Sequence, residues 1–153
     1  MIELTHTIVG AAIAAKIENP ALSLPLALAS HFVLDLLPHW NPHLNRELKE
    51  QGKISKRTTI IVAFDTILSL IAGFTIASQV LPNITHFIAV IAASFFAVLP
   101  DVIEGPYFFL KSKSNFLIRF VKFQTSLQLD VPVIPGLITQ VIVIAAAVWW
   151  IMV

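Results

Sequence analysis

Three stretches of this chain are each long enough and apolar enough to cross a lipid bilayer as a helix. A spanning helix needs about 20 mostly apolar residues, and residues 58–81, 83–103 and 131–153 each supply such a run. Overall, 57% of the residues are hydrophobic and 12% are charged, whereas soluble domains carry about 25% charged residues. A soluble helical protein would have little polar surface with which to cover so apolar an interior. The sequence therefore predicts an integral membrane protein.

Two further apolar stretches precede these three. Residues 20–39 form a run of nearly the same length, in which Pro25 predicts either a bend or the first turns of a helix. Residues 5–18 form a shorter run rich in Gly and Ala, which allow helices to pack closely. We therefore expect an all-α fold in one domain, residues 1–153, with about five transmembrane helices.

Lysine and arginine are distributed unevenly among the predicted connections. Of the ten in the chain, five lie in residues 46–57 and four lie in residues 111–122, whereas the connection "LPNIT" between the third and fourth helices has none. Cytoplasmic loops carry an excess of these residues. We expect the inner (plasma) membrane, with the N-terminus cytoplasmic and the C-terminus external. The net charge of +1 indicates no nucleic-acid partner.

Residues 107–123 carry aromatic rings at roughly helical spacing, interleaved with basic residues. Phe109, Phe116, Phe120 and Phe123 follow this spacing. Such a segment is typical of an amphipathic helix that lies among the cytoplasmic lipid headgroups. The alternative is a solvated loop packed against the bundle. We expect the interfacial helix.

Histidine and acidic side chains fall at one predicted depth, near the cytoplasmic end of the bundle. A carboxylate at the middle of a membrane helix costs about 2.5–3.5 kcal/mol to insert, and such residues usually face the protein interior and serve a function. His31 and Asp35 are four residues apart and therefore share one helix face. The set from the first four predicted helices is His6, His31, Asp35, His39, Asp65, Asp101 and Glu104.

Imidazole and carboxylate groups gathered in this way suit a divalent metal ion. These ligands favour Zn²⁺ first, with Mn²⁺ or Fe²⁺ as alternatives. A bound cation would also offset carboxylate charges that would otherwise protonate or repel one another. The predicted ligands are His6, His31, Asp35, Asp101 and His39.

Two further acids are candidates for catalysis. We expect Asp65 to act as a general base or to orient a ligating histidine, and Glu104 to take part in proton transfer. Other interpretations stay open. His39 could be an ordinary loop residue, Glu104 could cap a helix or pair with Lys111, and the whole layer could be a hydrogen-bonded core.

Three short segments carry a resemblance to a known family. "ELTHTIVGAAIAA", "SHFVLDLLPHWNP" and "FAVLPDVIEGP" resemble membrane-bound metal-dependent hydrolases of the LexA-binding, inner-membrane-associated type. Those proteins share an early His in a small-residue helix, an "SHxxxD" helix and an "LPD" helix end. The resemblance implies a metal site that contains His6, His31, Asp35 and Asp101. The chain has no "HRGxTHS" segment, and its "LPD" follows its "SHxxxD" instead of preceding it.

The predicted function is therefore metal-dependent hydrolysis at the cytoplasmic face, with a membrane-associated or lipid-like substrate and the lipid bilayer as partner. The metal would polarise the scissile group and acidify water. The alternative is a non-enzymatic membrane protein, either a metal or proton carrier or a bundle subunit with a structural polar layer. The sequence indicates neither the bond cleaved nor the oligomeric state.

Overall fold

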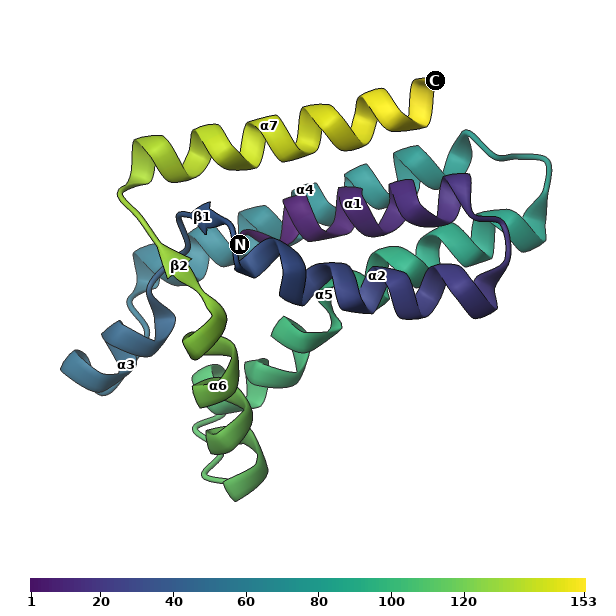
Figure 1. Ribbon diagram of the computed structural model, residues 1–153. Helices are drawn as coiled ribbons and strands as arrows, with labels where there is room; N and C mark the ends of the chain where they lie inside the picture. Colours follow the sequence, from purple (N-terminus) through teal and green to yellow (C-terminus); the bar gives the residue numbers. More distant parts are fainter.

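The computed structural model describes all 153 residues and is built from helices, as the sequence predicts. Five helices run side by side in one bundle, and the two chain ends lie at opposite ends of it (Figure 1). The central helix is the short α1, which packs against each of the other four. The five are α1 (Glu3–Lys16), α2 (Pro20–Asp35), α4 (Lys56–Ser78), α5 (Ile84–Phe109) and α7 (Val133–Met152).

Three of these helices, α4, α5 and α7, are long and apolar enough to cross a membrane. They have 23, 26 and 20 residues, whereas α1 and α2 have 14 and 16. The faces of α4 and α7 that point out of the bundle carry large apolar side chains, such as Phe64 and Ile142. An outward apolar surface of this kind matches a lipid environment.

The predicted boundary of the second helix lies beyond the observed one. α2 ends at Asp35, four residues before the predicted end, and His39 lies in the two-residue strand β1 (Pro38–His39). Pro38 disfavours helical geometry at the residue before it, so the helix stops short of the proline. β1 pairs in parallel with β2 (Leu129–Asp130), and His39 lies opposite Asp130.

Small side chains let α1 lie close to α5. A methyl group added at Gly10 would come within 2.6 Å of the Ala97 Cβ atom and 2.7 Å of the Ala93 carbonyl oxygen. Ala11 and Ala14 of α1 belong to the same buried cluster as Ala93 and Ala97. The close approach brings the start of α1 next to the C-terminal half of α5, and this contact positions His6.

Two helices lie outside the bundle, at the end that holds the N-terminus (Figure 1). They are α3 (Leu44–Gln51), which the sequence did not predict, and α6 (Asn115–Leu127). The predicted interfacial segment 107–123 is not one helix, because α5 continues to Phe109 and Lys111 then adopts a positive φ of 53°. Pro100 and Pro106 lie inside α5, and each removes a backbone hydrogen bond. The last turns of α5 leave the bundle direction toward α6.

Candidate metal centre

Two histidines from different helices stack at the centre of the site. The ring centroids of His6 in α1 and His31 in α2 are 4.1 Å apart, with an angle of 24° between the planes, and both side chains are fully buried. Asp101, from the proline-containing part of α5, joins them. One ligand atom from each of the three lies within 4.8 Å of the other two, so the group could hold a metal ion.

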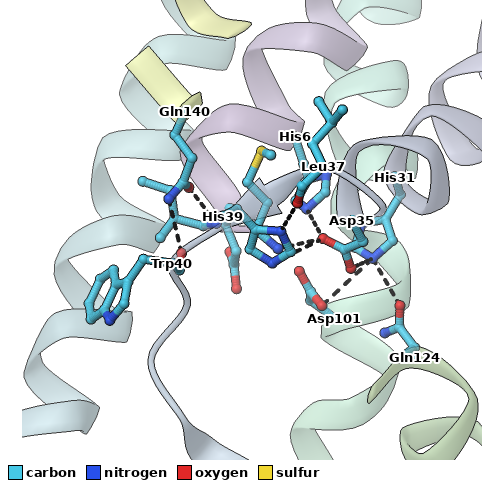
Figure 2. Close-up of polar contacts among 12 residues, drawn as sticks. His6, His31, Asp35, Leu37, His39, Trp40, Asp101, Gln124 and Gln140 are labelled. Carbon is cyan, nitrogen blue, oxygen red and sulfur yellow. Dashed lines mark hydrogen bonds and ion pairs between the residues drawn. The ribbon is translucent and has the colours of Figure 1, made fainter. Parts of the chain in front are cut away.

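Asp35 lies among the histidines (Figure 2). Its Oδ1 atom is 3.4 Å from His6 Nε2 and 3.8 Å from His39 Nε2, and its Oδ2 atom is 3.6 Å from His31 Nε2. The N-terminal ammonium of Met1 lies 2.5 Å from Oδ1 and forms a buried ion pair with the carboxylate. The imidazole contacts are longer than ordinary hydrogen bonds, although Asp35 is nearly fully buried.

The hydrogen bonds on the other sides of two rings determine their tautomers. His31 Nδ1 lies 2.8 Å from the carbonyl oxygen of Ala97, and His39 Nδ1 lies 2.8 Å from that of Leu37. A carbonyl oxygen can only accept, so Nδ1 carries the proton in both rings. In the neutral rings Nε2 is therefore unprotonated. It faces the carboxylate of Asp35 in both rings, and in His31 it also faces the Gln124 Oε1 atom, at 3.0 Å. Acceptors that face one another favour a cation between them, either a proton or a metal ion, in addition to the Met1 ammonium that already pairs with Asp35 Oδ1.

Several buried polar atoms of the site have no hydrogen-bond partner. Leaving such an atom unsatisfied costs about 1–3 kcal/mol. Those of the site are His6 Nδ1 and Nε2, Asp35 Oδ2, His39 Nε2, Glu104 Oε1 and Gln124 Nε2. Imidazole nitrogens and carboxylate oxygens are the donors that Zn²⁺ prefers, so the residues present fit the predicted kind of ion.

Asp65 lies apart from this group and contacts the start of α1. Its Oδ2 atom accepts from the backbone nitrogen of Glu3 at 2.7 Å, and its Oδ1 atom accepts from that of Leu4 at 3.2 Å. Ile2, which precedes α1, offers no capping side chain. Asp65 therefore caps α1 from the neighbouring helix α4. It influences the site indirectly, because it fixes the start of α1 and so the position of His6.

Gln140 of α7 holds the same region from the opposite side. Its Oε1 atom accepts from the backbone nitrogen of Ile2 at 2.9 Å, and its Nε2 atom donates to the carbonyl oxygen of Trp40 at 2.9 Å. Figure 2 shows this amide between α1 and the segment that carries His39. The amide therefore holds the start of α1 and the His39 segment together.

A cavity of about 540 Å³ opens beside the site. Asp65, Asp101, Glu104 and His39 are among the residues that line it, whereas His6, His31 and Asp35 are not. Arg46 and Lys49, from α3, line the same cavity. A small molecule that enters it can therefore approach Asp101 and Glu104 directly.

The structure brings together most of the predicted site residues. His6, His31, Asp35, His39 and Asp101 meet, Glu104 lines the cavity next to them, and Asp65 acts through α1. His86 lies elsewhere, and its Nε2 atom donates to the Ala14 carbonyl oxygen, at 2.9 Å. Sequence reasoning missed Gln124 and Gln140, whose only signal is an uncharged amide in an otherwise apolar helical pattern.

Comparison with known proteins adds no relative. No protein-family model, curated protein or solved structure matches this chain.

Proposed function

We propose that this protein is an integral membrane hydrolase that uses a divalent metal ion held by His6, His31 and Asp101, with Asp35 between the rings. The observation that carries the proposal is the convergence of ligand atoms from His6, His31 and Asp101, next to buried nitrogen and oxygen atoms of His6, Asp35 and His39 that have no partner. The resemblance to membrane-bound metal-dependent hydrolases supports the same assignment. Zn²⁺ suits this donor set best, with Mn²⁺ or Fe²⁺ as alternatives.

The membrane arrangement proposed here has five crossing helices, with the N-terminus in the cytoplasm and the C-terminus outside. α4, α5 and α7 meet the requirement for a span. The shorter α1 and α2 pack beside them, and the cavity and the basic α3 lie at the end that carries the N-terminus. The excess of basic residues at that end supports a cytoplasmic location, and α6 then lies at headgroup level.

The roles of the chain's own residues follow from their contacts. When bound, a divalent ion supplies a Lewis acid that polarises the scissile group and acidifies water. Glu104 has an unpartnered carboxylate oxygen and lines the cavity, so it can take a proton from water there. Both oxygens of Asp65 already accept backbone hydrogen bonds, which favours Glu104 as the base.

A substrate with a lipid tail suits the position of the cavity. Val62 and Phe108 contribute apolar wall beside the polar residues, and the cavity lies at the end of helices whose outer surfaces match lipid. Either a phosphoester or an amide in the headgroup region would suit the chemistry. Arg46 and Lys49, which line the same cavity, could contact a charged or polar headgroup there.

Metal content tests this proposal. The purified protein should contain a divalent metal that chelation removes and that Zn²⁺ restores. His31→Ala and Asp35→Ala should each lose the metal while they still insert, whereas the control His86→Ala should keep it. Retention of stoichiometric metal in both site variants would contradict the assignment. With the metal site established, Glu104→Gln should retain metal and lose hydrolysis of a lipid phosphoester or amide.

A carrier is the second candidate. Its polar residues should continue through the other half of the bundle, but Thr75 and Ser78 there direct their hydroxyl groups to carbonyl oxygens of their own helix. This observation favours the hydrolase. Metal flux into proteoliposomes, lost in Asp101→Asn, would reverse that preference.

A further inference from the structure

One side chain of the proposed centre comes from α6, which lies outside the bundle. The Gln124 side chain is 1% exposed, its Oε1 atom lies 3.0 Å from His31 Nε2, and its Nε2 atom has no partner. Val121 and Leu117, one and two turns earlier, are buried on the same side of α6. Figure 2 shows Gln124 reaching from α6 toward His31 and Asp101. The position of α6 relative to the bundle therefore determines whether Gln124 contacts His31.

A neighbouring face of α6 is apolar and largely exposed, although the Phe123 ring contacts Phe32 of α2, with centroids 5.9 Å apart. Phe116, Phe120 and Phe123 are spaced four and three residues apart, which aligns them along one side of a helix. Phe116 is 64% exposed and Phe123 is 50% exposed. The rings of Phe116 and Phe120 stack with centroids 5.8 Å apart. At about 100° per residue, this row borders the buried stripe that ends in Gln124.

Positive charge lies on the other side of the phenylalanine row. Arg119 and Lys122 are exposed and form no ion pair, and α6 contains no acidic residue. Lys111 and Lys113 precede the helix and are also exposed. An apolar row edged by unpaired cations complements a surface that offers hydrocarbon beneath negative charge, which is an anionic phospholipid leaflet.

The direction of α6 agrees with such a surface. α6 runs across the bundle direction at the end that holds the N-terminus (Figure 1). If the bundle helices cross the membrane, a helix across their direction lies along its surface. The row of rings then reaches the acyl boundary and the cations reach the headgroups.

We propose that α6 binds the anionic phospholipid surface, and that this binding holds Gln124 beside His31, so the metal centre is complete only at a negatively charged membrane. The regulation rests on the proposed metal function, whereas the docking of α6 does not. The docking is tested by the depth of α6 in the membrane, and the regulation is tested by the affinity of the site for metal. The two quantities are measured separately.

Depth is measured with nitroxide labels on the full-length protein, because the chain has no cysteine of its own. Phe116→Cys places a label on the row, and Ser126→Cys places a matched label on the polar side of the same helix. In vesicles that contain phosphatidylglycerol, the label at 116 should collide more with oxygen than with a water-soluble nickel chelate, and the label at 126 should show the reverse. Equal ratios at both positions, or no difference at 116 from vesicles of phosphatidylcholine alone, would overturn the docking.

Metal affinity is measured by Co²⁺ titration in the same two kinds of vesicle. Wild type should bind more tightly in anionic vesicles, by about tenfold, the size expected when a polar group that contacts the metal site is set in place, because the Gln124 amide lies beside His31 Nε2, the nitrogen assigned to the ion. Gln124→Ala should abolish the difference, and the control Ser126→Ala should keep it. The double variant Arg119→Glu with Lys122→Glu should also abolish the difference in Co²⁺ affinity. Because the lipid charge is the same for this variant, the result distinguishes docking of α6 from simple accumulation of Co²⁺ at the anionic membrane.

Raising the salt concentration provides a measurement that needs no variant. Salt screens the attraction between the α6 cations and the anionic lipid. The difference in Co²⁺ affinity between the two kinds of vesicle should therefore shrink for the wild type, as in the charge-reversed variant. Equal Co²⁺ affinity in both vesicles would overturn the regulation and leave the metal centre standing. If Co²⁺ bound in neither kind of vesicle, both the metal centre and the regulation would be overturned. The depth measured with the labels would still test the docking of α6.

Discussion

The imidazole of His31 donates from Nδ1 to the carbonyl oxygen of Ala97, at 2.8 Å. This bond comes from α5, the same helix that supplies Asp101 one turn later. It leaves His31 Nε2 as the atom that faces Asp35 and Asp101, at 3.6 and 3.8 Å. The packing of α2 against α5 thus selects the nitrogen available to a metal ion.

Nitrogen NMR of isotopically labelled histidine tests this assignment. In the metal-free protein His31 Nδ1 should carry a proton, and Zn²⁺ should shift the Nε2 resonance while Nδ1 stays protonated. His86, which bonds to Ala14 far from the site, should not change. A proton on Nε2 both before and after Zn²⁺ would instead identify a buried imidazolium paired with the two carboxylates.

Replacement of Asp65 should weaken the site without touching a ligand. In Asp65→Asn, one side-chain oxygen can still accept from one of the two backbone N–H groups, those of Glu3 and Leu4. The amide NH₂ faces the remaining N–H group and cannot accept from it, so helix capping is partly lost. We expect a loss of about 1 kcal/mol in stability and weaker metal binding, because His6 follows Leu4 by two residues. The control Thr75→Val, on the same helix, should change neither. Loss of hydrolysis with unchanged metal affinity would instead identify Asp65 as the general base.

The amide of Gln140 makes a prediction about stability. Gln140→Leu removes the partners of the Ile2 nitrogen and the Trp40 carbonyl oxygen, which should lower the free energy of unfolding by about 1–3 kcal/mol. The neighbouring Thr139 bonds only within its own helix, so Thr139→Val serves as the control. Equal thermal midpoints for the two variants in detergent would show that the amide does not hold α1 to the His39 segment.

Glu47 joins α3 to the start of α4 and predicts a pH dependence. Its carboxylate accepts from the Ser55 backbone nitrogen at 2.8 Å and from the Thr58 hydroxyl at 2.6 Å, and the Ser55 bond first of all holds the pKa of Glu47 below its usual range. Since the folded state has the lower pKa, this stabilisation is present above the ordinary pKa and is lost as the pH falls through the lowered one.

Hydrogen exchange at the Ser55 amide measures the effect. After correction for the intrinsic rate, exchange should accelerate in acidic buffer. Glu47→Gln should remove most of that change, whereas Glu50→Gln, which breaks an exposed pair with Arg46, should leave it intact. An acid response that survives in Glu47→Gln would assign the pH dependence to another group.

The sequence predicted the elements that depend on long, continuous patterns. The apolar runs predicted α4, α5 and α7, and the four-residue spacing of His31 and Asp35 predicted their shared face. What the sequence could not predict depends on contacts distant along the chain. Nothing near Asp65 shows that its oxygens meet the backbone of α1, and nothing near Gln124 shows that its amide meets His31.

Helix ends and short polar helices were also harder to predict. Pro38 made the position of His39 uncertain, and the structure places that residue on a short strand whose partner is about 90 residues later, a pairing that no local pattern encodes. The eight-residue α3 has little apolar surface of its own, and contacts such as the Glu47 bond to Ser55 stabilise it.

Two glycines of the chain make opposite predictions about packing. A methyl group on Gly136 of α7 would come within 2.6 Å of the Trp40 Cβ atom and closer still to the Trp40 nitrogen, whereas one on Gly105 of α5 would meet nothing within 4 Å. Gly136→Ala must therefore push α7 away from the His39 segment, at a cost of about 1–3 kcal/mol, and should weaken metal binding. Gly105→Ala should be neutral or stabilising, because alanine favours the helix. A thermal midpoint for Gly136→Ala at or above that of Gly105→Ala would show that α7 does not pack against the site.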